Sequence, residues 1–122
     1  RPLCLGKLDG AYVLASETCA LDLIGAAYLR DIQPGEVVFI HKDRLESFML
    51  SASTRKAYCI FEYIYFSRPD SSIFGHSVYT ARKNLGKNLA KEFPAQADFV
   101  MPIPDSGNSA ALGFAEQSGL TF

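Results

Sequence analysis

The sequence lacks an excess of either charge, because its 122 residues include 12 lysines and arginines against 13 aspartates and glutamates. A balanced surface attracts neither a nucleic acid nor an anionic membrane, so we expect no partner of either class. No apolar run approaches the ~20 residues that a membrane-spanning helix needs, and the first residues lack the layout of a cleavable leader. We therefore expect a cytoplasmic protein.

Cysteine and histidine are also scarce, with three of the first and two of the second. Cys4, Cys19 and Cys59 form no Cys-x-x-Cys pair and leave one residue over, which predicts reduced core thiols rather than a disulfide framework. His41 and His76 have no second histidine or carboxylate at the spacing of a metal site, so we assign them no role.

The composition is that of a globular protein, with 48% hydrophobic and 20% charged residues. The length is that of one average domain or two partial ones. The chain opens without methionine and closes on residues 119–122, which resemble a strand just beginning after a helix. We therefore expect a fragment of a longer protein.

In the first half of the chain, apolar residues alternate with polar ones or form short runs, which is typical of the strands of an α+β structure. Residues 2–8 and 11–15 flank Asp9-Gly10 and predict a β-hairpin. A short helix is expected over 19–27, with Leu23 and Ile24 on its inner face. Strands are expected over 37–41 and 47–50, on either side of an exposed charged tip, and the polar connector 51–56 is the expected domain boundary.

The second half changes to helical periods that alternate with single strands, as in a parallel α/β unit. Residues 59–67 fit a strand or a helix equally well. A helix over 77–92 is expected to bury one face and to turn another to water; the buried set is Val78, Ala81, Leu85 and Leu89, and the solvent-facing set is Arg82, Lys83, Lys87, Lys91 and Glu92. We also expect a strand over 99–103, covered on both faces, and a helix over 109–117 that ends at Gly119.

The loop between that strand and that helix reads Pro104-Asp105-Ser106-Gly107. A strand end followed by a glycine-bearing turn and a helix start presents several backbone N–H groups together, and the helix dipole adds a partial positive charge. This arrangement suits a phosphate group. The alternative is purely structural: Asp105 and Ser106 cap the helix, and Gly107 relieves the turn.

Several motifs along the chain resemble, in order and spacing, the amidophosphoribosyltransferases, that is, the glutamine phosphoribosylpyrophosphate amidotransferases. The resemblance covers the whole chain, and its most specific part is the block Phe61-Glu62-Tyr63-Ile64-Tyr65-Phe66-Ser67-Arg68-Pro69-Asp70-Ser71. The other matching segments are residues 1–6, 15–22, 34–36, 77–82 and 102–107.

The resemblance implies two incomplete domains. Residues 1–58 would be the C-terminal part of an α+β N-terminal-nucleophile glutaminase domain, and residues 59–122 the N-terminal part of an α/β type I phosphoribosyltransferase domain with a parallel sheet. The family carries out the first step of de novo purine synthesis, in which ammonia from glutamine displaces pyrophosphate from phosphoribosyl pyrophosphate. The resemblance also implies that the full-length protein is a homo-oligomer and that nucleotides inhibit it.

The family's catalytic residues would lie outside this segment. Its nucleophile is a chain-terminal cysteine whose own amine acts as the base, so neither Cys4, Cys19 nor Cys59 can take that role. We expect residues 1–122 alone to be inactive.

By the same resemblance, a pyrophosphate loop is formed by Asp105, Ser106, Gly107, Asn108 and Ser109, with Ser106 reaching a Mg²⁺ ion. Tyr65 resembles a residue near the path of ammonia between the two active sites; its alternative is an interface or core tyrosine. Cys59 matches the first ligand of a 4Fe–4S cluster that one branch of the family carries; its alternative is a buried thiol.

Two other functions stay open. The chain could be a noncatalytic module that binds a nucleotide or pyrophosphate, which Mg²⁺-dependent binding without glutamine chemistry would mark. It could instead be a structural piece whose exposed strand edges drive association.

Overall fold

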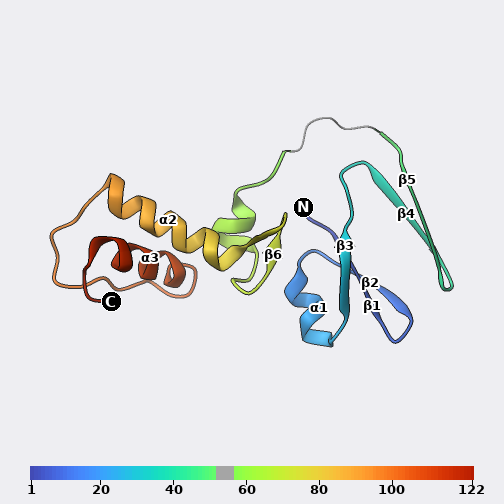
Figure 1. Ribbon diagram of the computed structural model, residues 1–122, viewed down its shortest axis with the longest axis horizontal. Coiled ribbons are helices and arrows are strands. Elements are labelled where there is room, and N and C mark those ends of the chain that lie inside the picture. The colour runs from blue at the N-terminus through green and yellow to red at the C-terminus, as the bar shows by residue number, and fades with distance from the viewer. Residues whose placement is uncertain (52–56) are drawn as a thin grey trace. The chain divides into compact units, whose positions relative to one another are not determined.

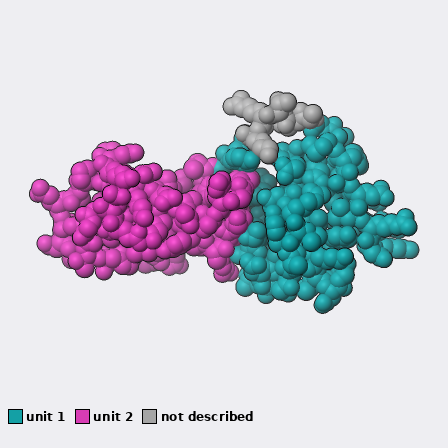
Figure 2. Space-filling model, viewed as in Figure 1, with its two compact units in different colours: residues 1–59 teal, residues 60–122 magenta. Residues whose placement is uncertain are grey.

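The computed structural model describes residues 1–51 and 57–122, so residues 52–56 of the polar connector lie outside the described part. The chain forms two compact units, Arg1–Cys59 and Ile60–Phe122, which Figure 2 colours separately. Helices and antiparallel strands make up both units (Figure 1).

The first unit contains a three-stranded antiparallel sheet in the order β2-β1-β3. The strands are β1 (Cys4–Leu8), β2 (Ala11–Ala15) and β3 (Ala27–Asp31). Asp9 and Gly10 have φ angles of 47° and 85°, and two consecutive positive φ angles are typical of the tight turn that matches the twist of a hairpin. The predicted hairpin is confirmed, whereas β3 is a strand that the sequence patterns did not indicate.

Helix α1 (Thr18–Ile24) is shorter than expected, because Gly25 adopts a left-handed conformation with φ 71° and ends it. Leu21, not Leu23 or Ile24, is the buried side chain of its middle turn. A Cβ atom at Gly6 of β1 would lie 2.9 Å from Leu21 Cδ2, so glycine lets the helix lie close on the sheet. The predicted inner face of this helix was therefore wrong.

A second hairpin pairs β4 (Glu36–His41) with β5 (Arg44–Met49). Its last pair is His41 with Arg44, so the connecting turn holds only Lys42 and Asp43 and is shorter than the charged tip expected over 41–46. Large apolar side chains such as Phe39 and Phe48 are exposed on it.

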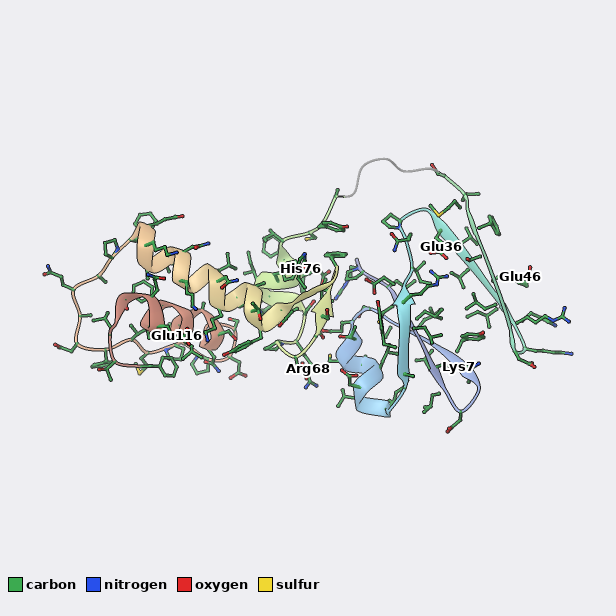
Figure 3. The ribbon with its side chains drawn as sticks, in the orientation of Figure 1. Lys7, Glu36, Glu46, Arg68, His76 and Glu116 are labelled. Carbon is green, nitrogen blue, oxygen red and sulfur yellow. The ribbon has the colours of Figure 1, made fainter. Side chains whose placement is uncertain are left out.

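A bidentate ion pair joins the end of β3 to the beginning of β4. Arg30 donates from Nη1 to Glu36 Oε2 at 2.9 Å and from Nη2 to Oε1 at 2.7 Å, and the Gln33 amide donates to Oε2 at 2.8 Å. Glu36 is labelled in Figure 3. The hydrogen bonds from these donors hold the pKa of Glu36 at about 2, below its ordinary value of 4.5, and the bond from Arg30 contributes most.

The second unit begins with a π-helix, η1 (Glu62–Phe66), which settles the open choice for residues 59–67 in favour of a helix. A small hairpin of β6 (Ser72–Ile73) and β7 (His76–Ser77) follows. It leads into α2 (Val78–Glu92), whose first turn is capped because Ser77 Oγ accepts a hydrogen bond from the Thr80 amide at 3.2 Å.

Helix α3 (Asn108–Ser118) packs on α2 at backbone distance. A Cβ atom at Gly86 would lie 1.8 Å from the carbonyl oxygen of Ala110, and one at Gly113 would lie 1.9 Å from that of Lys83. At the exposed rim, Glu116 accepts from Lys83 at 2.5 Å and from Lys87 at 3.1 Å (Figure 3). Exposed pairs of this kind add little stability, so the two glycines determine the contact.

The buried face of α2 differs from the predicted one. It consists of Val78, Arg82, Gly86 and Ala90, which recur every four residues. Leu85 and Leu89 are 44% and 50% exposed in this chain, although they were expected inside, and Arg82 was expected in water. The prediction followed hydrophobicity, whereas the packing follows the small residues that let two helices approach closely.

The expected strand 99–103 appears as a single parallel bridge between Phe99 and Thr121, supported by a 2.7 Å hydrogen bond from the Val100 amide to the Thr121 carbonyl. Phe99, Met101 and Ile103 are exposed, so the strand is not covered on both faces as predicted. Within residues 1–51 and 57–122, no helix is long and apolar enough to cross a membrane.

We predict that Glu36 titrates in the folded protein with a pKa of about 2. Because this pKa is lowered, the contribution of the ion pair to stability is present above pH 4.5 and is lost as the pH falls toward 2. Carboxyl chemical shifts from NMR would measure it. Arg30→Met should raise the pKa of Glu36 toward 4.5, whereas Arg44→Met at the far end of the hairpin should leave it unchanged; an unshifted pKa in the Arg30 variant would refute the assignment.

We also predict that Gly86→Ala weakens the α2–α3 contact by about 3 kcal/mol, because its new methyl group overlaps the Ala110 carbonyl. Hydrogen exchange of α3 amides measures this as a lower free energy of local opening. Asn84→Ala, at an exposed position of the same helix, is the matched control and should change that free energy by less than about 0.5 kcal/mol. Equal effects of the two substitutions would contradict the close approach.

Candidate functional site

The loop 102–107 leads directly into the first turn of α3. Gly107 is the N-cap residue, with φ −76° and ψ −17°, and no side chain caps the helix. The Asn108 amide instead donates to the Asp105 carbonyl at 3.2 Å, and the peptide bond between Pro104 and Asp105 is cis. The structural alternative, in which Asp105 or Ser106 caps the helix through its side chain, is therefore not what the loop does.

Position 107 requires glycine because neighbouring backbone lies too close for a side chain, and not because its φ angle is unusual. A Cβ atom there would lie 2.8 Å from the carbonyl oxygen of Ile103, a distance that real Cβ atoms essentially never show. The loop thus folds tightly onto its own beginning.

The five predicted loop residues differ in exposure. Asp105, Ser106 and Asn108 are exposed, and Gly107 is half-buried. Ser109 is only 8% exposed, so its side chain belongs to the interior of the unit. Of the five, Ser109 could therefore meet a ligand only through its backbone.

The loop combines a helix N-terminus with exposed oxygen-bearing side chains. The first amides of a helix have no intrahelical partners, and its dipole favours an anion there. Mg²⁺ prefers oxygen ligands and in phosphate sites takes only one or two from the protein, the others coming from water and phosphate. The Ser106 hydroxyl and the Asp105 carboxylate fit that role, although no group of three or more metal-binding side chains occurs within the described ranges.

Tyr65 lies in η1 and is 67% exposed, with its ring 5.9 Å from that of Phe66 in an edge-on arrangement. Within residues 60–122, Tyr65 is therefore not packed in the core. Ile60, Phe61 and Phe66 are exposed nearby in sequence, so the segment presents an apolar surface.

Cys59 is exposed in this chain, whereas Cys4 and Cys19 are buried as expected. Burial raises the pKa of the Cys4 thiol. An iron–sulfur cluster takes four cysteine thiolates. This chain offers one exposed cysteine, so its residues by themselves do not fit a cluster.

Sequence reasoning missed a buried polar cluster formed by Glu62, Ser67 and Arg82. Ser67 Oγ donates to Glu62 Oε2 at 3.0 Å, and Arg82 Nη2 donates to the Ser67 carbonyl at 2.8 Å. The three residues are 1%, 2% and 5% exposed. The four-residue spacing of Arg82 with Val78 and Gly86 is the signal that could have placed it inside.

Curated relatives match the chain from end to end. The amidophosphoribosyltransferase of Archaeoglobus fulgidus is 52% identical over 122 residues, and that of Bacillus subtilis is 51% identical over the same length; each match covers the whole chain. Along its whole length, the chain is similar to a segment of amidophosphoribosyltransferases. It spans about a quarter of these relatives, 27% and 26% of their lengths.

Solved structures agree with this similarity. One, described as the allosteric regulatory enzyme of purine biosynthesis, matches 98% of the chain at 52% identity with a TM-score of 0.94 and is itself covered to 26%. The glutamine phosphoribosylpyrophosphate amidotransferase of B. subtilis, solved with ADP and GMP, matches 99% at 51% identity with a TM-score of 0.94, over 27% of its own length. No family model matches the chain.

We predict that Gly107→Ala displaces the loop, because its methyl group would meet the Ile103 carbonyl. Amide chemical shifts should change across residues 103–108. Ser106→Ala, which adds no atom one residue earlier, should shift only its immediate neighbours. Changes confined to residues 106–108 in the Gly107 variant would show that the loop has room for a side chain.

Proposed function

We propose that this chain is a segment of an amidophosphoribosyltransferase, the enzyme of the first step of purine biosynthesis. The observation that carries the proposal is the roughly 50% identity to such enzymes along the entire chain. In the proposed reaction, ammonia released from glutamine attacks C1 of the ribose in phosphoribosyl pyrophosphate. The new C–N bond forms as the C–O bond to pyrophosphate breaks, and loss of a proton leaves 5-phosphoribosylamine.

Within this scheme, residues 1–58 belong to the glutaminase domain and residues 59–122 to the phosphoribosyltransferase domain. The division of the chain into compact units at Cys59 and Ile60 supports this assignment. Other residues that complete the two active sites would come from the remainder of the protein, so residues 1–122 alone are inactive.

The loop of Asp105, Ser106, Gly107, Asn108 and Ser109 binds the pyrophosphate of the substrate. Its backbone amides and the dipole of α3 stabilise negative charge as it develops on the leaving group, and an electrostatic contribution of this kind is often the largest one in catalysis. Ser106 would hold a Mg²⁺ ion, which supplies further stabilisation of that charge. This role is supported by the side chains of Asp105 and Ser106, because both are exposed and neither caps α3.

Tyr65 lines the path that ammonia follows between the two active sites. An aromatic wall excludes water, which would otherwise protonate ammonia or let it escape. The large exposed fraction of Tyr65 fits a side chain that meets another part of the protein. We infer further that nucleotides inhibit the full-length protein, which the complex of the B. subtilis enzyme with ADP and GMP supports. The resemblance to the family also leads us to propose that the full-length protein is a homo-oligomer.

The full-length protein should convert glutamine and phosphoribosyl pyrophosphate to glutamate, pyrophosphate and phosphoribosylamine when Mg²⁺ is present. Ser106→Ala should weaken binding of Mg²⁺-phosphoribosyl pyrophosphate about tenfold, the loss expected for one interaction with a charged group. Calorimetry with that substrate complex measures this.

The matched control is Ser118→Ala, at the opposite end of α3, which should leave the affinity unchanged. Binding of pyrophosphate with Mg²⁺ but no release of glutamate by the full-length protein would overturn the enzymatic proposal in favour of a noncatalytic binding module. Unchanged affinity in the Ser106 variant would remove that residue from the site.

A further inference from the structure

Arg82 is a buried arginine whose guanidinium donates hydrogen bonds to the backbone of another element. It lies on α2, is 5% exposed, and donates from Nη2 to the Ser67 carbonyl at 2.8 Å and from Nε to the Tyr63 carbonyl. A buried guanidinium is costly unless its N–H groups are hydrogen-bonded, and a bulky apolar residue would fill the same space at lower cost. The structural reason for its burial lies in the carbonyl groups that it reaches.

Two backbone carbonyls that accept hydrogen bonds from Arg82 bracket Tyr65 in the sequence. Tyr63 lies two residues before it and Ser67 two residues after it, so both flanks of the exposed tyrosine are tied to α2. The ends of the segment are secured by further bonds: the Tyr63 hydroxyl donates to the Ile73 carbonyl at 2.6 Å, and Ser67 Oγ donates to Glu62 Oε2 at 3.0 Å. The backbone of η1 is thereby held at both ends while the Tyr65 ring projects outward.

We propose that Arg82 is a positioning residue for ammonia transfer, which it serves by fixing the π-helical turn that presents Tyr65. This inference rests on the proposed role of Tyr65. The planar fork of arginine can reach two carbonyls at once with a fixed geometry, whereas the single ammonium of lysine cannot reproduce both bonds. Loosening the turn would leave a gap in the aromatic wall, and ammonia would then be lost to water rather than delivered.

The test compares two nitrogen sources in the full-length enzyme. Ammonium chloride supplied from solution bypasses the internal path, whereas glutamine depends on it. In Arg82→Met, glutamine-supported synthesis of phosphoribosylamine should fall at least tenfold relative to ammonia-supported synthesis, and more than one glutamate should be released per phosphoribosylamine. Arg82→Lys should show a smaller defect of the same kind.

Lys87→Met is the matched control, because it also removes a positive charge from α2 but at the rim, where Lys87 forms an ion pair with the exposed Glu116. Its ratio of glutamine-supported to ammonia-supported synthesis should equal that of the unsubstituted enzyme. If Arg82→Met does not fold, Arg82→Lys, which keeps the buried charge but cannot make both bonds to the carbonyls, takes its place in the same assay. A parallel fall of both activities, or an unchanged ratio, overturns the inference.

Hydrogen exchange separates this inference from the proposed function. Peptides covering residues 61–67 should exchange faster in Arg82→Met, with residues 108–118 unaffected. Unchanged exchange at 61–67 refutes the positioning role whatever the enzyme does. Failure of the unsubstituted enzyme to make phosphoribosylamine from either nitrogen source refutes the proposed function instead, while the exchange measurement still decides whether Arg82 holds the turn.

Discussion

The second unit depends on the approach of α2 and α3 at backbone distance. Gly86 and Gly113 face carbonyl oxygens of the opposite helix so closely that neither position can hold a Cβ atom. Interiors are packed too densely for helices to shift freely around such a contact. The contact therefore fixes where α3 begins, and with it the place at which the loop 102–107 must turn.

The same face of α2, one turn before Gly86, also holds a second element in place. Positions 78, 82, 86 and 90 lie along one line of the helix, so Arg82 is buried next to the turn that carries the close-packed Gly86. From there it binds two carbonyls of η1, a π-helix whose irregular backbone leaves groups that need partners. One helix thus orients both the loop that starts α3 and the turn that bears Tyr65.

Local chemistry made part of the fold predictable. The Asp9-Gly10 turn and the left-handed Gly119 after α3 each depend on a few neighbouring residues, and each appears where the pattern placed it. The inner faces of α1 and α2 were not predictable from hydrophobicity, because Leu23 and Leu85 are exposed in this chain. Helix α1 instead packs Leu21 against Gly6 of β1, and α2 meets α3 at Gly86. Strand β3 was missed because its residues Ala27–Asp31 show no clean alternation. The choice between strand and helix for residues 59–67 stayed open because no sequence signal marks a π-helix.

The loop 102–107 was predicted as a turn before a helix, but its manner of starting the helix was not. A serine or aspartate at the N-cap would stabilise α3 by about 1 kcal/mol, and this chain has both residues immediately before Gly107. Neither caps the helix, and glycine occupies the N-cap position because the Ile103 carbonyl leaves no room for a side chain. Capping by a side chain would also satisfy an amide that an anion could otherwise bind. Helix α3 therefore lacks a stabilising cap at the end where two exposed oxygen-bearing side chains adjoin its amides. Such a compromise between stability and binding is expected at a functional site.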